Sequence, residues 1–295
     1  MKIAAAQYPI GFFRNWDDWK KNVETWVEKS EDADILIFPE YASMELVSLL
    51  DEKIRKELKS QIVEMNNRLA KFLAVFVELT HAFTKIIICP SFPVFENGQF
   101  VNRVFVVGPN GLTGYQDKFF MTRFEDEEWG ISSGTKKLSV FETNWGKFGI
   151  QTCYDVEFGI GSKLLCESGA EVIFAPSCTE TLKGAARVHV GARARAMENQ
   201  CYVAVSQTVG DALWSPAVDI NYGYSAIYST PDLGFPDEGI LAMGEPQKKM
   251  WLFANLEMEK IHEVRKNGSV LNFKSNSAIK NALTDSEIEI QHIRI

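Results

Sequence analysis

Short apolar segments alternate along the chain with longer amphipathic ones. The apolar segments are rich in β-branched residues and have the length of strands that are buried on at least one face. They lie at residues 2–7, 34–38, 85–89, 104–108, 146–152, 171–175 and 202–206. This alternation predicts an α/β protein.

The amphipathic segments between these strands predict helices. Apolar residues recur with the helical period of 3.6 from Trp16 to Val27 and again from Ile54 to Phe72. A further helix is expected over 184–199, which is rich in Ala, Arg and Met, and a short one over 163–168, closed by Gly169. Helices therefore separate several of the predicted strands.

Two segments predict β-hairpins instead of helical crossovers. The run from 104 to 117 has a turn at 108–111, and the run from 137 to 152 has a turn near 144–146. Hairpins add antiparallel pairs, so we expect two mixed sheets flanked by helices. Because no linker or low-complexity tract interrupts the chain, one domain is the simplest organisation.

Composition and charge exclude several classes of partner. The chain is 46% hydrophobic, and its 31 Lys and Arg against 39 Asp and Glu give a net charge of −8. With no dense basic run, nucleic acids and anionic membranes are poor partners. No apolar run reaches the ~20 residues of a spanning helix, and Gln7 and Pro9 interrupt the apolar start. We therefore expect a cytoplasmic protein.

The cysteines and histidines give no metal or disulfide pattern. The five cysteines are Cys89, Cys153, Cys166, Cys178 and Cys201. Their odd number and the lack of a C-x-x-C pair argue against a disulfide framework or a structural zinc site. None of the four histidines stands at metal-ligand spacing from another. We expect chemistry that uses side chains alone, without a metal or cofactor.

Three reactive side chains follow strand-like segments. Glu40 follows 34–38, Lys118 follows the arm of the first hairpin, and Cys153 follows 146–152. Taken singly, each has an ordinary explanation as a surface residue or an inert buried thiol. In α/β proteins, however, catalytic groups lie on the loops at strand ends.

Together the three residues predict nucleophilic catalysis. A thiol with a pKa of about 8.5 needs a base or a cation to react at neutral pH. Glu40 can accept the proton of Cys153, and Lys118 can stabilise first the thiolate and then the oxyanion formed at a carbonyl or nitrile carbon. The backbone N–H of Tyr154 would be a further donor.

The segments around these residues resemble the motifs of the nitrilase superfamily, the carbon–nitrogen hydrolases. ILIFPEY surrounds Glu40, GYQDKFF surrounds Lys118 and GIQTCYDVEF surrounds Cys153, in the order found in that family. The flanking segments KIAAAQYP, APSCTE and ARARAMENQCYVAVSQ agree as well. The resemblance covers about residues 1–265. Three ordered motifs make it specific.

This resemblance implies a fold and an assembly. Members of the family are single-domain four-layer αββα sandwiches that usually form homodimers through helices. Residues 1–265 would form this domain, and 266–295 would be a C-terminal extension that packs on the domain or on a dimer partner.

The resemblance also implies residue roles. Glu40 would be the general base, Lys118 the oxyanion stabiliser and Cys153 the acylated nucleophile. A second glutamate, which positions the substrate and the lysine in many members, best matches Glu125, with Glu127 as the alternative. Tyr154 and Cys178 are further candidates for positioning the substrate. Cys178 is a candidate wall residue, although a core thiol is the simpler interpretation.

Two departures from the family pattern concern the surroundings of the site. The sequence after CYDVEF is Gly159-Ile160-Gly161-Ser162 where many members have Pro-Glu, which predicts a looser helix start. Phe120 stands where a histidine is common in the lysine motif. Neither departure removes a catalytic group.

The expected function is hydrolysis of a non-peptide carbon–nitrogen bond in a small amide or carbamoyl compound. A nitrile is less favoured, because Tyr154-Asp155 resembles the amidase branches and nitrilases tend to have Trp-Glu there. Two alternatives stay open: acyl transfer to an amine or alcohol, and a catalytically silent binding or scaffold protein. The substrate is not identified by the sequence.

Overall fold

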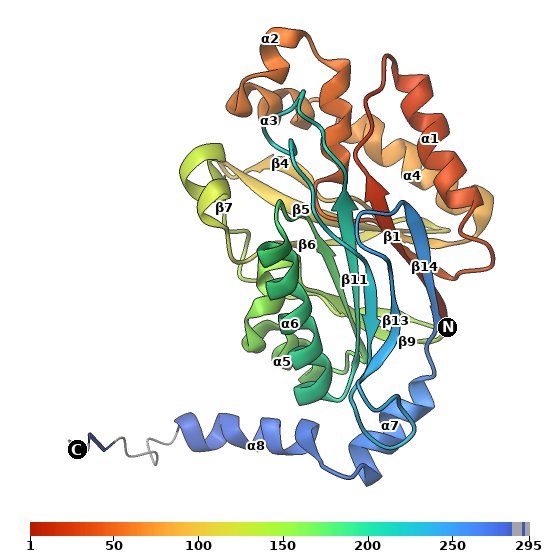
Figure 1. Ribbon diagram of the computed structural model, residues 1–295, viewed down its shortest axis with the longest axis vertical. Helices are drawn as coiled ribbons and strands as arrows, with labels where there is room; N and C mark the ends of the chain where they lie inside the picture. The colour runs from red at the N-terminus through yellow and green to blue at the C-terminus, as the bar shows by residue number, and fades with distance from the viewer. Residues whose placement is uncertain (285–290, 293–295) are drawn as a thin grey trace.

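Strands and helices alternate along the computed structural model, which describes residues 1–284 and 291–292 (Figure 1). The strands are β1 (Lys2–Pro9), β2 (Ile35–Ile37), β3 (Ile86–Ile88), β4 (Phe92–Glu96), β5 (Gln99–Gly108), β6 (Gly111–Asp117), β7 (Ile131–Ser132), β8 (Phe141–Thr143), β9 (Gly146–Ile150), β10 (Val172–Ser177), β11 (Tyr202–Val209), β12 (Ala226–Tyr228), β13 (Ile240–Met243) and β14 (Met250–Asn255). The α-helices are α1 (Trp16–Glu28), α2 (Glu52–Arg55), α3 (Leu58–Asn66), α4 (Leu69–Phe83), α5 (Gly159–Glu167), α6 (Leu182–Asn199), α7 (Met258–Asn267) and α8 (Asn272–Thr284). Three short helical segments are η1 (Ala42–Leu49), η2 (Phe124–Trp129) and η3 (Cys153–Glu157).

The strands form two mixed halves that meet at one place. The central order is β4-β5-β3-β2-β1-β11-β10-β9-β8. β1 and β11 pair only where Gln7–Pro9 faces Gln207–Val209, so the halves diverge away from this contact. Hydrogen bonds thus connect the two expected sheets into one curled mixed sheet, and the predicted hairpins are present as β5–β6 and β8–β9.

The alternation of side chains along β1 and β11 explains the layers. Ala4 and Ala6 belong to the core cluster that also contains residues of α1 and α4, whereas Ile3 and Ala5 belong to a second cluster between the two halves. In the same way, Ala204 of β11 faces the second cluster, and its neighbours on either side belong to a third cluster with α6. Successive strand residues point to opposite faces. The order helix, sheet, sheet, helix confirms the expected αββα fold.

Two helix predictions need correction. The apolar stripe from Ile54 to Phe72 is not one helix but parts of α2, α3 and α4. The break before α3 is stabilised by Glu57, whose carboxylate accepts hydrogen bonds from the first turn of that helix. Hydrophobic periodicity continues across such a break and does not reveal it. The helix predicted at 163–168 starts earlier, at Gly159, where a methyl group on Gly161 would overlap the Gln151 side chain.

The described part of the C-terminal extension packs on its own chain. α8 contacts α5 and α6, and the Phe273 N–H donates to Gln200 Oε1 at 3.1 Å. Asn276 Nδ2 likewise donates to Asn199 Oδ1 at 3.2 Å. In Figure 1, the distal end of α8 points away from the rest of the molecule. Residues 285–290 and 293–295 lie outside the described residues, and none of the described helices is long and apolar enough to cross a membrane.

Candidate active site

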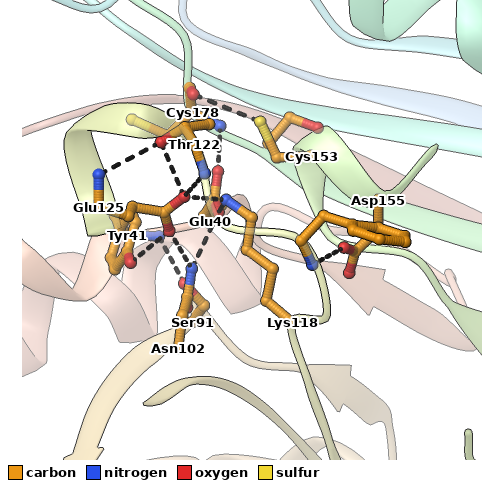
Figure 2. Close-up of polar contacts among 12 residues, drawn as sticks. Glu40, Tyr41, Ser91, Asn102, Lys118, Thr122, Glu125, Cys153, Asp155 and Cys178 are labelled. Atoms are coloured by element: carbon orange, nitrogen blue, oxygen red, sulfur yellow. Dashed lines mark hydrogen bonds and ion pairs between the residues drawn. The ribbon is translucent and has the colours of Figure 1, made fainter. Parts of the chain in front are cut away.

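Three loops at strand ends bring Glu40, Lys118 and Cys153 together (Figure 2). Glu40 follows β2, Lys118 follows β6, and Cys153 follows β9. All three are buried, with 1%, 1% and 5% of their surfaces exposed. β2 pairs with β3, β3 pairs with β5, and β5 pairs with β6, so the first two loops lie on one half of the sheet. Cys153 comes from the other half. The cluster therefore lies where the two halves meet.

Lys118 lies between two carboxylates. Its Nζ is 2.8 Å from Glu40 Oε1 and 2.6 Å from Glu125 Oε2. Glu127, the alternative second glutamate, is exposed on η2 and pairs with Arg123 at the surface. Between the two candidates, only Glu125 belongs to the buried cluster.

Hydrogen-bond donors surround both carboxylates. Glu125 accepts from Tyr41 Oη at 2.7 Å and from the Thr122 N–H and Oγ1 at 3.0 and 2.9 Å. Asn102 Nδ2 lies 2.9 Å from Glu40 Oε1 and 3.2 Å from Glu125 Oε1, so one amide bridges the two acids. Donors to a carboxylate favour its ionised form.

The other oxygen of Glu40 contacts the segment that follows β10. The Cys178 N–H donates to Glu40 Oε2 at 3.0 Å, and the Cys178 carbonyl oxygen is the acceptor, at 3.5 Å, for the Cys153 thiol. One residue thus links the expected base to the expected nucleophile through its backbone. The Cys178 thiol itself faces Asn221 Oδ1 at 3.3 Å.

Burial and the charge of Lys118 oppose each other in setting the protonation of the acids. Burial raises the pKa of Glu40 above its ordinary value, and Lys118 offsets part of this rise. Burial also raises the pKa of Glu125, but Lys118 outweighs it and the net direction is down. For Lys118, burial lowers the pKa, and Glu125 and Glu40 reverse this to well above the usual value. The lysine is therefore a permanent cation.

Cys153 sits in a strained backbone conformation at the start of η3. Its φ of 48° is in the left-handed region, which residues with a Cβ rarely adopt. Burial, followed by the negative charge of Glu40, raises the pKa of its thiol well above the ordinary value, and Lys118 only partly opposes this. Burial and the neighbouring Glu40 thus favour the protonated form of the Cys153 thiol.

Asp155 connects the loop that contains Cys153 to the loop that contains Lys118 through hydrogen bonds. Its carboxylate accepts from the Phe119 N–H at 3.2 Å and from the Phe120 N–H at 2.8 Å (Figure 2). Burial raises the pKa of Asp155 to about 7, and Lys118 opposes the rise. The Phe120 ring, where a histidine is common, packs against Phe158 with centroids 4.4 Å apart.

One cavity of about 230 Å³ is lined by the site residues expected from the sequence, apart from the alternative glutamate Glu127. Its lining includes Glu40, Lys118, Glu125, Cys153, Tyr154 and Cys178. Sequence reasoning missed Asn102, Tyr41 and Thr122. Tyr41 is the last residue of the motif ILIFPEY and Thr122 lies two residues after GYQDKFF, whereas Asn102 is inside β5 and belongs to no motif. Within the described residues, no group of three or more His, Cys, Asp and Glu could hold a metal ion.

Comparison with known proteins places the chain in a family. The family model described as carbon-nitrogen hydrolase matches residues 2–266. The chain belongs to this family. The match spans almost the whole described fold, including the three loops of the candidate site.

Two named relatives illustrate the similarity. The probable hydrolase YhcX of Bacillus subtilis is 32% identical over 276 residues, which are 93% of this chain and 53% of YhcX. The omega-amidase NIT2 of Xenopus tropicalis is 28% identical over 184 residues, 59% of this chain and 62% of NIT2. The chain thus spans about half to two-thirds of the length of these relatives.

Solved structures share the fold. Nit3 of Saccharomyces cerevisiae, a member of branch 10 of the nitrilase superfamily, has a TM-score of 0.68 at 23% identity, covering 90% of this chain and 93% of that one. The carbon-nitrogen hydrolase of Helicobacter pylori G27 has a TM-score of 0.74 at 16% identity, covering 97% of each chain. The nitrilase fold is therefore shown for this chain.

Proposed function

We propose that this protein hydrolyses a non-peptide carbon–nitrogen bond of a small amide or carbamoyl compound through a thioester on Cys153. One observation carries the proposal: a buried thiol, a hydrogen-bonded carboxyl group and a buried ammonium line one cavity. Family membership and the omega-amidase relatives support the same class of reaction.

The first step is attack of Cys153 on the carbonyl carbon. Because burial keeps the thiol protonated, the sulfur becomes nucleophilic only when Glu40 takes its proton. The carbonyl π electrons move to oxygen, and the oxyanion lies between Lys118 and the backbone N–H of Tyr154. A fixed cation in a water-poor site stabilises this charge strongly.

The second step splits the carbon–nitrogen bond. Glu40 returns the proton to the departing nitrogen, the oxyanion electrons re-form the carbonyl, and ammonia or an amine leaves. Glu40 then deprotonates a water that attacks the thioester, and the sulfur departs with a proton to regenerate the thiol. The acid product is released, and no cofactor or metal takes part.

The remaining cavity residues would position these groups. Glu125 accepts a second hydrogen bond from the Lys118 ammonium, and the Cys178 backbone contacts both Glu40 and Cys153. Tyr154 contributes its backbone donor and part of the cavity wall. These are positioning roles, since the bonds are made and broken at Cys153.

A homodimer is also part of the proposal. Exposed apolar side chains lie on α6, where Val190 is 69% and Met197 is 45% exposed. Twofold pairing is the commonest soluble assembly, and it buries such surfaces. Light scattering that gives twice the chain mass on dilution supports the dimer, and a constant 33.3 kDa mass rejects it. A cytoplasmic location stays a prediction.

Product analysis with matched amides and nitriles tests the function. Ammonia release from an amide panel, absent in Cys153→Ala, is expected, with higher kcat/KM for each amide than for the nitrile of the same side chain. Acyl transfer is the alternative function, and added amines that capture most of the acyl group would favour it. An enzyme preparation that binds panel members but releases no ammonia would favour a scaffold protein instead.

A further inference from the structure

The outer part of the cavity has three charged side chains, of which two form an ion pair with each other. Besides the buried cluster, the cavity is lined by Glu157, Glu180 and Arg187. Arg187 Nε lies 3.2 Å from Glu157 Oε1, so that cation already has a counter-charge. Glu180 makes no ion pair within the described part of the chain. The cavity thus presents one carboxylate that the protein itself leaves uncompensated.

Two other acids act electrostatically on Glu180. Burial, then Asp219 and Glu128, raise the pKa of its carboxyl. These three acids come from separate segments: the loop between β10 and α6, the loop between β11 and β12, and η2. A cation bound among them relieves their mutual repulsion, whereas an anion adds to it.

The rest of the lining is mostly apolar and aromatic. It includes Tyr41, Phe124, Trp129, Val188, Ala217 and Ile220. Apolar walls suit a hydrocarbon segment, and aromatic faces also tolerate an ammonium group. A substrate with a reactive amide, an apolar middle and a cationic end matches this distribution.

We infer that the cavity takes a primary amide or carbamoyl compound whose far end is cationic, and that Glu180 selects this end. The inference rests on the proposed function, because Cys153 fixes where the reacting end lies. Acidic residues alone would not define a ligand. Here one of them lines the cavity that contains the nucleophile. A carboxylate-ended substrate would be repelled by Glu180 and would find Arg187 already paired.

A matched set of substrates tests the inference. We would compare ω-amino primary amides of four-, five- and six-carbon chains with methyl-ended and carboxylate-ended amides of equal length. For the best chain length, kcat/KM should be about fivefold higher for the amino amide than for the methyl-ended one. Glu180→Gln should bring this ratio close to one, and added salt should reduce it. Glu259→Gln, which removes an exposed acid on α7, is the control and should keep the ratio.

Binding measurements with Cys153→Ala distinguish failure of this inference from failure of the proposed function. Calorimetry with this variant should show tighter binding of the ω-amino amide, lost when Glu180→Gln is added. Hydrolysis of methyl-ended amides without preference for the cation, or preference for the carboxylate, would overturn this inference and leave the proposed function standing. Selective binding of the cation with no turnover of any amide by the wild type would support cation selection and overturn the proposed function.

Discussion

Two buried glutamates on the segment after β2 have opposite surroundings. Glu40 and Glu45 are 1% and 2% exposed. Glu40 faces the Lys118 ammonium at 2.8 Å and lines the cavity. Glu45 instead accepts hydrogen bonds from Tyr8 Oη at 2.8 Å and Trp19 Nε1 at 2.7 Å, both neutral donors in the core beneath α1.

The difference shows what makes a buried carboxyl suited to catalysis. Burial raises the pKa of Glu45 to about 8, and the neutral donors Tyr8 and Trp19 oppose this only in part. Burial raises the pKa of Glu40 as well, but a neighbouring cation opposes it and a thiol lies close enough to affect it. Low exposure therefore does not distinguish Glu40 from Glu45. Glu40 differs because it has a fixed counter-charge and lies beside a cavity.

Removing either Lys118 or the carboxylate of Glu40 should have the largest effect on activity. Lys118→Ala and Glu40→Gln should each lower kcat/KM by at least ~100-fold, because one removes the proposed oxyanion donor and the other removes the proposed base. The double variant should lose little more, since the residues act as a unit. Lys85→Ala is the control: this lysine is also buried, but its Nζ donates to the carbonyl oxygens of Glu31 and Ala33, away from the cavity.

Steady-state kinetics on one amide checks this prediction, with the free energy of unfolding measured alongside. Lys85→Ala should reduce stability and leave kcat/KM near the wild-type value. Fully additive losses in the Lys118 and Glu40 double variant would show that these two residues do not share one site.

The Glu45 region should affect stability and its pH dependence. The folded-state pKa of about 8 lies above the ordinary value of 4.5, so the folded protein keeps a proton that the unfolded chain releases between these pH values. The free energy of unfolding should therefore fall as pH rises from 4.5 to 8, by up to about 1.4 kcal/mol per unit from this group. Below 4.5 this contribution is fully present.

Urea unfolding across this pH range measures the slope. Glu45→Gln has no proton to lose, so its free energy of unfolding should vary less with pH than that of the wild type. Glu259→Gln, on the exposed face of α7, should keep the wild-type slope. Equal slopes for wild type and Glu45→Gln would contradict a protonated Glu45 in the folded state.

Replacing Asn102, whose side-chain amide bridges Glu40 and Glu125, should have the smallest effect of these three groups of substitutions. Asn102→Ala removes a donor to the ionised Glu40, which disfavours the charged form of the base. We expect kcat/KM to fall about tenfold at neutral pH. The acid limb of the pH profile of kcat/KM should also move to higher pH, because the proposed base must be ionised to act. A tenfold loss with an unmoved acid limb would assign Asn102 a purely structural role.

The sequence predicted the elements whose signals are local and missed features that depend on contacts between distant segments. Hydrophobic runs located β1, β2 and β11, and hairpin turns located β6 and β9. The pairing of β14 with β1 was not predicted, since it joins the two ends of the domain. The break before α3 is an exception, because it depends on local capping by Glu57, which hydrophobic periodicity does not register.

The same distinction applies to the candidate site. Glu40, Lys118 and Cys153 stand in motifs, and the interval from the lysine favoured Glu125 over Glu127. Asn102 and the backbone of Cys178 gained their roles only through folding, because the contacts they make come from different strands. Glu45 gave no signal either, although it lies in the segment after a recognised motif.

Intact-mass and peptide spectra of the protein mixed with an amide substrate test the central claim most directly. At short times, or after acid quenching, the wild type should carry one acyl group, and the modified peptide should contain Cys153. The adduct should be absent from Cys153→Ala and present in Cys166→Ala and Cys201→Ala, whose thiols lie in the core beside α5 and α6. Substrate turnover by Cys153→Ala, or an acyl group on another cysteine, would contradict the account.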